Sequence, residues 1–240
     1  MNQKLSAACF FGAMSAIITA CGDGTPNLRI GNVVTRTGET CTDFSEDVVW
    51  GKGTFDVAGY GFFGENSQFR YAPPITVFYE PVTTGTGNDS PDVYLSGVNV
   101  RLTSLTDGVS IAADDAEFSS QFRAYYEGDT FFVAPTMIPS AVGAALRDQV
   151  GVGDLATLKI ELQAFGKEDG DDIVSPFVDF YVDVCNGCLT VNTGMCLDYE
   201  EGDKQCDLWQ NRPVECCQWS DNTQVCPAIT EVPPEEPTAR

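Results

Sequence analysis

The sequence predicts an all-β protein, namely an antiparallel immunoglobulin-like or fibronectin-III-like β-sandwich followed by a small disulfide-bonded C-terminal tail. Three observations indicate this fold class. Short runs of alternating apolar and polar residues recur along the chain, clusters of Gly, Asn, Pro and Asp separate them, and a single stretch has helical spacing. About seven or eight short strands with closely spaced turns are typical of a two-sheet sandwich.

The N-terminus resembles a bacterial lipoprotein signal. Lys4 precedes an uncharged apolar stretch at 5–18, which is too short to span a bilayer. The stretch ends in Ile-Thr-Ala-Cys21, a match to the lipobox, in which the cysteine is acylated and the signal is cut before it. Two or three acyl chains anchor a protein stably. We therefore expect a signal peptide at 1–20 and a linker at 21–27; the alternative is an ordinary signal peptide with a structural Cys21.

The sandwich is expected at 28–184. Its strands are expected at 28–35, 55–57, 75–80, 98–103, around Phe118 and Phe122, and at 131–133, 158–164 and 178–184. The last run is the clearest, because Val178, Phe180, Val182 and Val184 share one face. A loop with an Asp-Gly turn at 169–170 joins 158–164 to 178–184, which predicts a hairpin.

The helical signal lies at 140–150. Val142, Ala145, Leu146 and Val150 recur at helical spacing, and Ser140 is the expected N-cap. Gly143 weakens the pattern, so we expect a short crossover helix or a turn.

The cysteines predict a disulfide framework. Cys9 lies inside the signal and Cys21 in the lipobox, and the others are Cys41, Cys185, Cys188, Cys196, Cys206, Cys216, Cys217 and Cys226. An even number in an exported chain indicates up to four bridges, without fixing the pairing. We expect Cys41 to pair with the tail, which closes a loop worth about 4–5 kcal/mol in the chain-entropy model. The adjacent Cys216 and Cys217 are expected to bond to different partners.

The C-x-x-C motif at 185–188 has a structural, a redox and a zinc interpretation. A redox motif needs a helix N-terminus to lower the thiol pKa, and a zinc site needs further ligands at fixed spacing. Because this motif ends a strand at an Asn-Gly turn, we expect a structural disulfide. The cystine-rich tail is expected at 185–227 and a disordered Pro/Glu-rich end at 228–240.

Charge and composition narrow the function. The chain carries a net charge of −22 and has no histidine. The charge disfavours binding to nucleic acid or anionic lipid, and the missing histidine removes the commonest nucleophile partner and zinc ligand. We expect no cofactor and no catalytic residue.

Two groups of residues are candidate sites. Asp169, Asp171 and Asp172 are weak calcium candidates, with a solvated hairpin tip as the alternative. Trp209 and Trp219 are candidates for a binding surface, because a cystine-bound tail has little core in which to bury them.

Several segments together are similar to a family of uncharacterised envelope lipoproteins of myxobacteria and related deltaproteobacteria. They are the lipobox, Gly-Glu-Thr-Cys41, the turn at 138–141 and the closing SPFVDFYVDVCNGCL at 175–189. Only the VCNGCL end is specific, and the part after Cys196 matches least. The resemblance implies an envelope lipoprotein with a sandwich domain and implies no reaction.

The expected function is that of a non-enzymatic lipoprotein, anchored by acyl chains in the bacterial outer membrane and facing the periplasm or the cell surface. It would act through binding or structure, on an envelope protein or polysaccharide and not on nucleic acid. The alternatives are a calcium-dependent adhesin and a carboxylate-based hydrolase of envelope polymers.

Overall fold

The computed structural model describes residues 27–37, 41, 43–50, 52–63, 69–80, 93–125, 130–196, 206–220 and 222–226. The expected signal peptide, Cys21, nearly all of the linker and the segment 228–240 lie outside these residues. No helix in the described part of the chain is long and apolar enough to cross a membrane.

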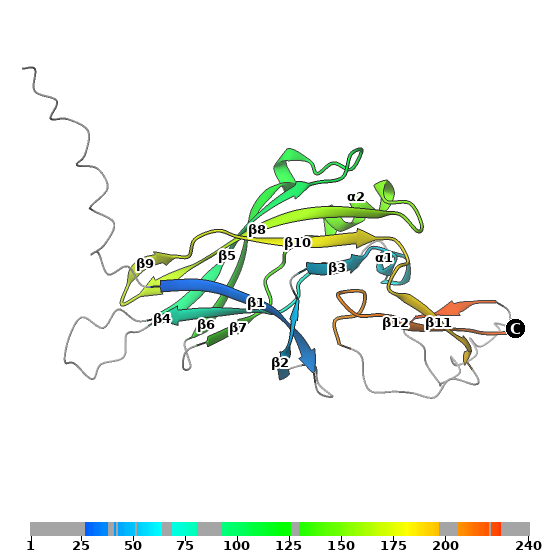
Figure 1. The fold of residues 1–240 in the computed structure, drawn as a ribbon, viewed down its shortest axis with the longest axis horizontal. Helices are drawn as coiled ribbons and strands as arrows, with labels where there is room; N and C mark the ends of the chain where they lie inside the picture. The colour runs from blue at the N-terminus through cyan, green and yellow to red at the C-terminus, as the bar shows by residue number, and fades with distance from the viewer. Residues whose placement is uncertain are drawn as a thin grey trace, which may run out of the picture.

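The structure is all-β, as predicted, and its core lies between two sheets (Figure 1). The four-stranded sheet has the order β2-β1-β4-β7, made of β1 (Asn27–Thr37), β2 (Asp43–Trp50), β4 (Ile75–Glu80) and β7 (Thr130–Val133). The six-stranded sheet has the order β3-β10-β8-β5-β6 with β9 beside β8, made of β3 (Lys52–Asp56), β5 (Val93–Ser104), β6 (Glu117–Tyr125), β8 (Leu155–Glu168), β9 (Asp171–Val174) and β10 (Val178–Cys185). Buried side chains of both sheets form one hydrophobic cluster.

The period-2 patterns correctly identify the inward faces of the long strands. Phe180, Val182 and Val184 of β10 are buried, whereas Asp179 and Tyr181 point outward. Along β8, every second residue from Ala156 to Gly166 is buried. Alternation of this kind places one face of the sheet in the core and leaves the other to solvent.

The fold class is as predicted, but two strand pairs are parallel, one at the edge of the sandwich and one in the tail. β3 pairs with β10 from Lys52 opposite Tyr181 to Asp56 opposite Cys185. In a third, three-stranded sheet, β11 (Thr190–Met195) runs parallel to β12 (Val214–Gln218), which pairs antiparallel with β13 (Gln224–Val225). Both parallel pairs join strands separated by long stretches of chain, where no tight turn imposes antiparallel pairing.

The predicted hairpin is longer than expected. Asp169 and Gly170 both have positive φ and join β8 to β9, and β10 follows β9 along the same edge of β8. Ser175 bridges the interruption, since its N–H donates to the Ala164 carbonyl at 2.8 Å and its Oγ accepts from the Ala164 N–H at 2.9 Å. β9 and β10 therefore act together as one interrupted partner strand of β8.

The predicted helix forms as α2 (Ser140–Gln149) and buries Val142 and Leu146. The N-cap prediction is wrong: Pro139 occupies that position, and no side chain caps the helix. Packing requires a glycine at position 143, because a Cβ there would lie 2.1 Å from the Tyr60 hydroxyl. The short helices α1 (Gly59–Phe63) and η1 (Ala113–Asp115) were not predicted.

The described part of the tail packs back onto the sandwich. Trp209, Val214 and Cys216 are fully buried in the core cluster that the two large sheets share. Only a small second cluster, around Cys196 and Cys217, belongs to the tail alone. The tail thus contributes to the sandwich core in addition to being held by disulfides.

Candidate functional site

All eight cysteines assigned to the framework form disulfides. The pairs are Cys41–Cys206, Cys185–Cys188, Cys196–Cys217 and Cys216–Cys226. Cys41 bonds to the tail across 165 residues, and the adjacent Cys216 and Cys217 have different partners, as expected from the sequence.

A buried carboxylate holds the C-x-x-C loop. Asp56, fully buried at the end of β3, accepts hydrogen bonds through Oδ1 from the N–H groups of Ala58 at 2.9 Å and Gly187 at 2.7 Å. Its Oδ2 accepts from the Leu189 N–H at 2.8 Å. Three donors compensate the loss of water around the charge, and they fasten the start of the tail to the edge strand of the six-stranded sheet.

The Asp56 carboxylate also decides between the redox, zinc and structural interpretations of the C-x-x-C motif at 185–188. Asp56 and the sulfurs of Cys185 and Cys188 place their ligand atoms within 4.8 Å of one another, and no other group of this kind occurs among the described residues. A disulfide offers no thiolate to a metal, and a nearby anion opposes a thiolate at the buried Cys185. The geometry is that of a structural bridge. Asp56 was not identified from the sequence, although an acid between the apolar Phe55 and Val57 was a usable signal.

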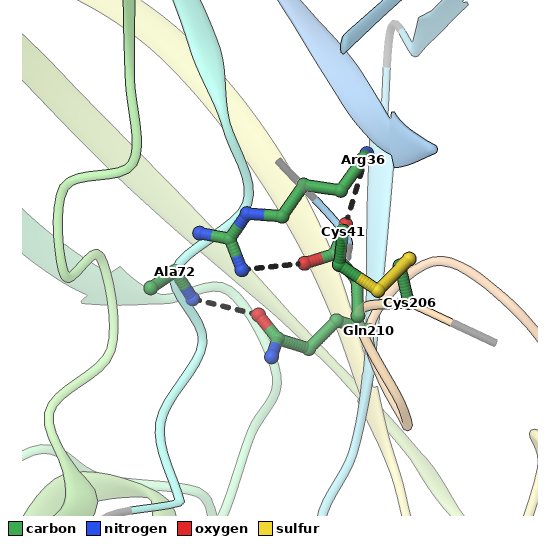
Figure 2. Close-up of polar contacts among 6 residues, drawn as sticks. Arg36, Cys41, Ala72, Cys206 and Gln210 are labelled. Atoms are coloured by element: carbon green, nitrogen blue, oxygen red, sulfur yellow. Dashed lines mark hydrogen bonds and ion pairs between the residues drawn. A yellow bond between two sulfur atoms is a disulfide. The ribbon is translucent and has the colours of Figure 1, made fainter. Parts of the chain in front are cut away.

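Polar contacts and one disulfide join the tail to β1, to Cys41 just after it and to Ala72 before β4 (Figure 2). Next to Cys41–Cys206, the Arg36 guanidinium pairs with Asp207 at 3.0 Å and the Arg36 N–H donates to the same carboxylate at 3.2 Å. The Gln210 side-chain oxygen accepts from the Ala72 N–H at 2.7 Å. These contacts fix the tail on the sandwich independently of the bridge.

The tail also covers the open edge of β3. The Asp56 N–H donates to the Trp209 carbonyl at 2.9 Å, and the Asn211 N–H donates to the Thr54 carbonyl at 2.8 Å. Asn211 Oδ1 in turn accepts from the Thr54 N–H at 2.7 Å and from the Tyr71 hydroxyl at 3.0 Å. The backbone groups that a free edge strand would present to another chain are thus satisfied internally.

Trp209 does not form a binding surface, so this prediction is wrong. Its exposure is 0%, and its ring meets Phe69 edge-on at 6.2 Å in an aromatic cluster with Phe55, Tyr60 and Tyr71. Trp209 is buried because this part of the tail packs into the core of the sandwich. Trp209 has φ 57°, a left-handed conformation that bulky residues rarely adopt.

Trp219 is partly buried against the Cys196–Cys217 cluster. Its Nε1 atom is buried without a hydrogen-bond partner among the described residues. The two tryptophans therefore do not form the joint exposed surface that the sequence suggested.

The three calcium candidates lie at the β8–β9 hairpin but form no cage. The Asp172 carboxylate pairs with the Lys167 ammonium at 2.9 Å, and Lys167 also donates to the Gly170 carbonyl at 3.1 Å. The hydrogen bond to Asp172 raises the pKa of Lys167. Asp169, Asp171 and Asp172 are exposed. The positively charged side chain of Lys167 already neutralises Asp172.

The remaining candidate is the solvent-facing side of the six-stranded sheet, which we call the outer face. Its charged side chains form cross-strand pairs: Lys52 with Asp183 at 2.6 Å, Arg101 with Glu117 at 3.0 Å, and Lys159 with Asp179 at 3.1 Å. Lys159 also contacts Glu161 at 3.3 Å, and its pKa is raised, chiefly by the hydrogen bond to Asp179.

Aromatic rings lie among these charges. Phe177, just before β10, and Tyr181, on the outward side of β10, are 36% and 38% exposed. The Arg101 guanidinium lies 4.4 Å from the centroid of the Phe177 ring, and Arg123 lies 4.7 Å from that of Tyr94. Cation–π contacts of this kind hold both partners in place.

A shallow depression of about 660 Å³ lies on the opposite side of the sandwich, between β1 and β4. Its lining includes the Arg29–Glu80 ion pair and the exposed ring of Phe78. A Cβ at Gly31 would lie 2.3 Å from that ring, so the Phe78 ring covers the backbone at this glycine.

Comparison of the chain with protein-family models, with curated proteins and with solved structures found no match.

Proposed function

We propose that the protein is a membrane-tethered lipoprotein of the bacterial cell envelope that acts through binding or structure and not through catalysis. The cystine framework is the observation that carries this proposal. Four disulfides, one of them closing 165 residues, require an oxidising compartment such as the periplasm or the cell surface. The lipobox at Cys21 supplies the acyl anchor for the same destination.

A binding or structural role is favoured over catalysis by how the charged groups are used. The chain contains no histidine. On the outer face the carboxylates of Glu161 and Asp179 both contact Lys159, and the carboxylate of Asp56 is occupied by three backbone donors. These carboxylates serve as structural partners, whereas a hydrolase needs two acids converging on a substrate. The calcium-dependent adhesin is disfavoured by the Lys167–Asp172 pair.

Lipidation is tested by metabolic labelling with an alkyne-bearing fatty acid. The wild-type chain should incorporate the label and fractionate with membranes, and Cys21→Ala should lose both properties. Cys9→Ala is the matched control, because this cysteine is removed with the signal and its loss should leave labelling unchanged. A Cys21→Ala protein that still carries the label would overturn the proposal.

Orientation is tested with a membrane-impermeant amine reagent on intact cells. The Lys52 side chain is 50% exposed and reports on the outer face. Labelling of the Lys52 peptide before lysis indicates a surface protein engaged in recognition or adhesion. Labelling only after the outer membrane is opened indicates a protein that faces the periplasm, with a structural or assembly role.

A further inference from the structure

We propose that the reduced form of the Cys185–Cys188 pair binds zinc or a similar thiophilic divalent cation, with the Asp56 carboxylate as the third protein ligand. The structural role described above is that of the oxidised motif, and a dithiol reductant gives access to the second state. The inference goes beyond the proposed function and does not depend on the acyl anchor. Four features of the motif lead to it: the exposed sulfur, the hydrogen bonds of the loop, the ligand set and the local charge.

The first feature is the accessibility of Cys188. Among the eight cysteines that form disulfides it alone is exposed, and the others are buried or half-buried. Its bridge also closes the shortest of the four loops, so breaking it restores least freedom to the chain. A dithiol attacks the Cys188 sulfur, which forms a mixed disulfide and releases the Cys185 thiolate. The second thiol of the reductant then closes its own disulfide and releases Cys188, so that two electrons and two protons pass to the protein.

The second feature is that hydrogen bonds hold the C-x-x-C loop independently of its disulfide. The Asp56 carboxylate accepts from the N–H groups of Gly187 at 2.7 Å and Leu189 at 2.8 Å. The Cys185 carbonyl accepts from the Val57 N–H at 2.8 Å. These contacts fix the backbone at both ends of the loop. The reduced cysteines therefore stay side by side, and a metal ion orders little further chain when it binds.

The third feature is the ligand set. The two sulfurs and a carboxylate oxygen of Asp56 lie within 4.8 Å of one another. Tetrahedral zinc has bonds of about 2.0–2.3 Å to such ligands and holds them about 3–4 Å apart, so small side-chain adjustments suffice. Three backbone donors leave acceptor capacity on Oδ2 of the carboxylate, and the exposed side of Cys188 leaves the fourth position to water. Thiolates favour zinc over calcium and magnesium, which prefer oxygen ligands.

The fourth feature is the local charge. Asp56 and Cys185 are both buried. The three donors to the Asp56 carboxylate are backbone N–H groups, which leave its negative charge in place. Two thiolates beside this anion are unfavourable on their own, so the thiols keep their protons in the absence of a metal. A divalent cation displaces the two thiol protons and offsets the negative charge of all three ligands.

The first experiment identifies the reducible bridge. The full-length chain is treated with a dithiol without denaturant, the free thiols are alkylated, and the peptides are quantified by mass spectrometry. Cys185 and Cys188 should be alkylated before any other cysteine of the framework. Earlier reduction of a different pair would overturn the inference.

The second experiment adds cobalt(II) to the reduced full-length chain in the absence of oxygen, after the dithiol has been removed. The thiolate-to-cobalt charge-transfer absorption should rise until one ion is bound per chain, and zinc should abolish the absorption by displacing cobalt. The oxidised chain should show no such absorption. A reduced chain without a charge-transfer band would show that the pair does not bind the metal.

Two substitutions test the assigned ligands. Cys188→Ser removes an exposed thiolate and Asp56→Asn removes the carboxylate, and each should weaken zinc binding about tenfold or more. Asp183→Asn is the matched control, because its carboxylate pairs with Lys52 on the outer face and should not contribute. Wild-type affinity in Cys188→Ser or in Asp56→Asn, or an equal loss in Asp183→Asn, would overturn the ligand assignment.

Thermal unfolding of each variant shows whether the fold is intact. Cys188→Ser changes an exposed side chain, so it tests the site even if Asp56→Asn does not fold. Fatty-acid labelling at Cys21 is independent of these measurements, so failure of the metal site is distinguishable from failure of the proposed function.

Discussion

At the residue scale, Asp56, which accepts three hydrogen bonds, fastens the start of the tail to the sandwich. Asp56→Asn keeps the shape of the side chain but replaces one carboxylate oxygen with an NH₂ group. This group is a hydrogen-bond donor and would face a backbone N–H, which is also a donor. We expect the free energy of unfolding to fall by about 3 kcal/mol, measured by urea denaturation at neutral pH. Asp107→Asn, at an exposed turn, is the control and should change little. Equal effects of the two substitutions would contradict the assigned role.

Tyr60 gives the fold a dependence on alkaline pH. Burial raises the pKa of the Tyr60 hydroxyl from 10.0 to about 12. Above pH 10 the unfolded chain loses this proton first, so the group's contribution to stability is complete below pH 10 and is lost as the pH rises towards 12. The slope is about 1.4 kcal/mol per pH unit for one group.

Tyr60→Phe should therefore be less stable than wild type at pH 8, because the hydroxyl donates to the Phe69 carbonyl at 2.8 Å. The difference should shrink between pH 10 and 12, since the variant has no proton to lose at this position. Urea denaturation at several pH values checks this. Parallel pH profiles for the two proteins would show that Tyr60 does not carry the effect.

At the scale of elements, a bulge in β5 depends on a glycine in β8. The register shifts between Leu95 and Gly97, and Gly166 lies opposite Leu95. A Cβ at Gly166 would stand 2.2 Å from the Tyr94 carbonyl oxygen, which is backbone and cannot move aside. Gly166→Ala should destabilise the fold by about 2 kcal/mol or more.

Gly151→Ala is the control for this substitution. There the nearest atom to an added Cβ is the carboxylate of Asp154 at 2.6 Å, at the end of a flexible side chain. Its effect on the urea midpoint should be small. A Gly166→Ala protein that unfolds at the same urea concentration as wild type would contradict the predicted clash between the added Cβ and the Tyr94 carbonyl oxygen.

Most strands could be predicted because their information is local. β10 and β8 alternate strictly, so each pattern gives both the element and its buried face. The parallel partner of β10 could not be predicted, because the choice of β3 depends on contacts between segments more than a hundred residues apart. The short helix α1 was missed because Gly59–Phe63 contains glycines and aromatic residues instead of a helical period.

At the scale of the whole molecule, the Cys41–Cys206 bridge closes by far the longest loop. Removing it with Cys41→Ala/Cys206→Ala should cost about 5 kcal/mol, whereas Cys185→Ala/Cys188→Ala should cost about 2 kcal/mol because its loop is short. The Asp56 hydrogen bonds further hold the short loop closed without its bridge. Urea denaturation of both variants measures the loss in the free energy of unfolding for each. Equal losses would refute the dependence on loop length.

The candidate site was only partly predictable for the same reason. The eight framework cysteines follow from their even number and the expected export of the chain, but the burial of Trp209 follows from a core that the tail reaches only in the folded state. The outer face emerges when outward residues of the six strands are placed side by side. Each strand taken alone shows just alternating polar residues.

The cover that residues 209–211 place over β3 also sets an order of assembly. A chain is synthesised from its N-terminus, so β3 and its neighbours are complete before the segment that closes their edge. Until that segment arrives, the sheet lacks its last hydrogen-bonding partner and the core lacks a tryptophan. Completion of the fold thus requires the chain through Asn211, and a prematurely terminated product would expose the unpaired edge of β3 to other chains and to proteases.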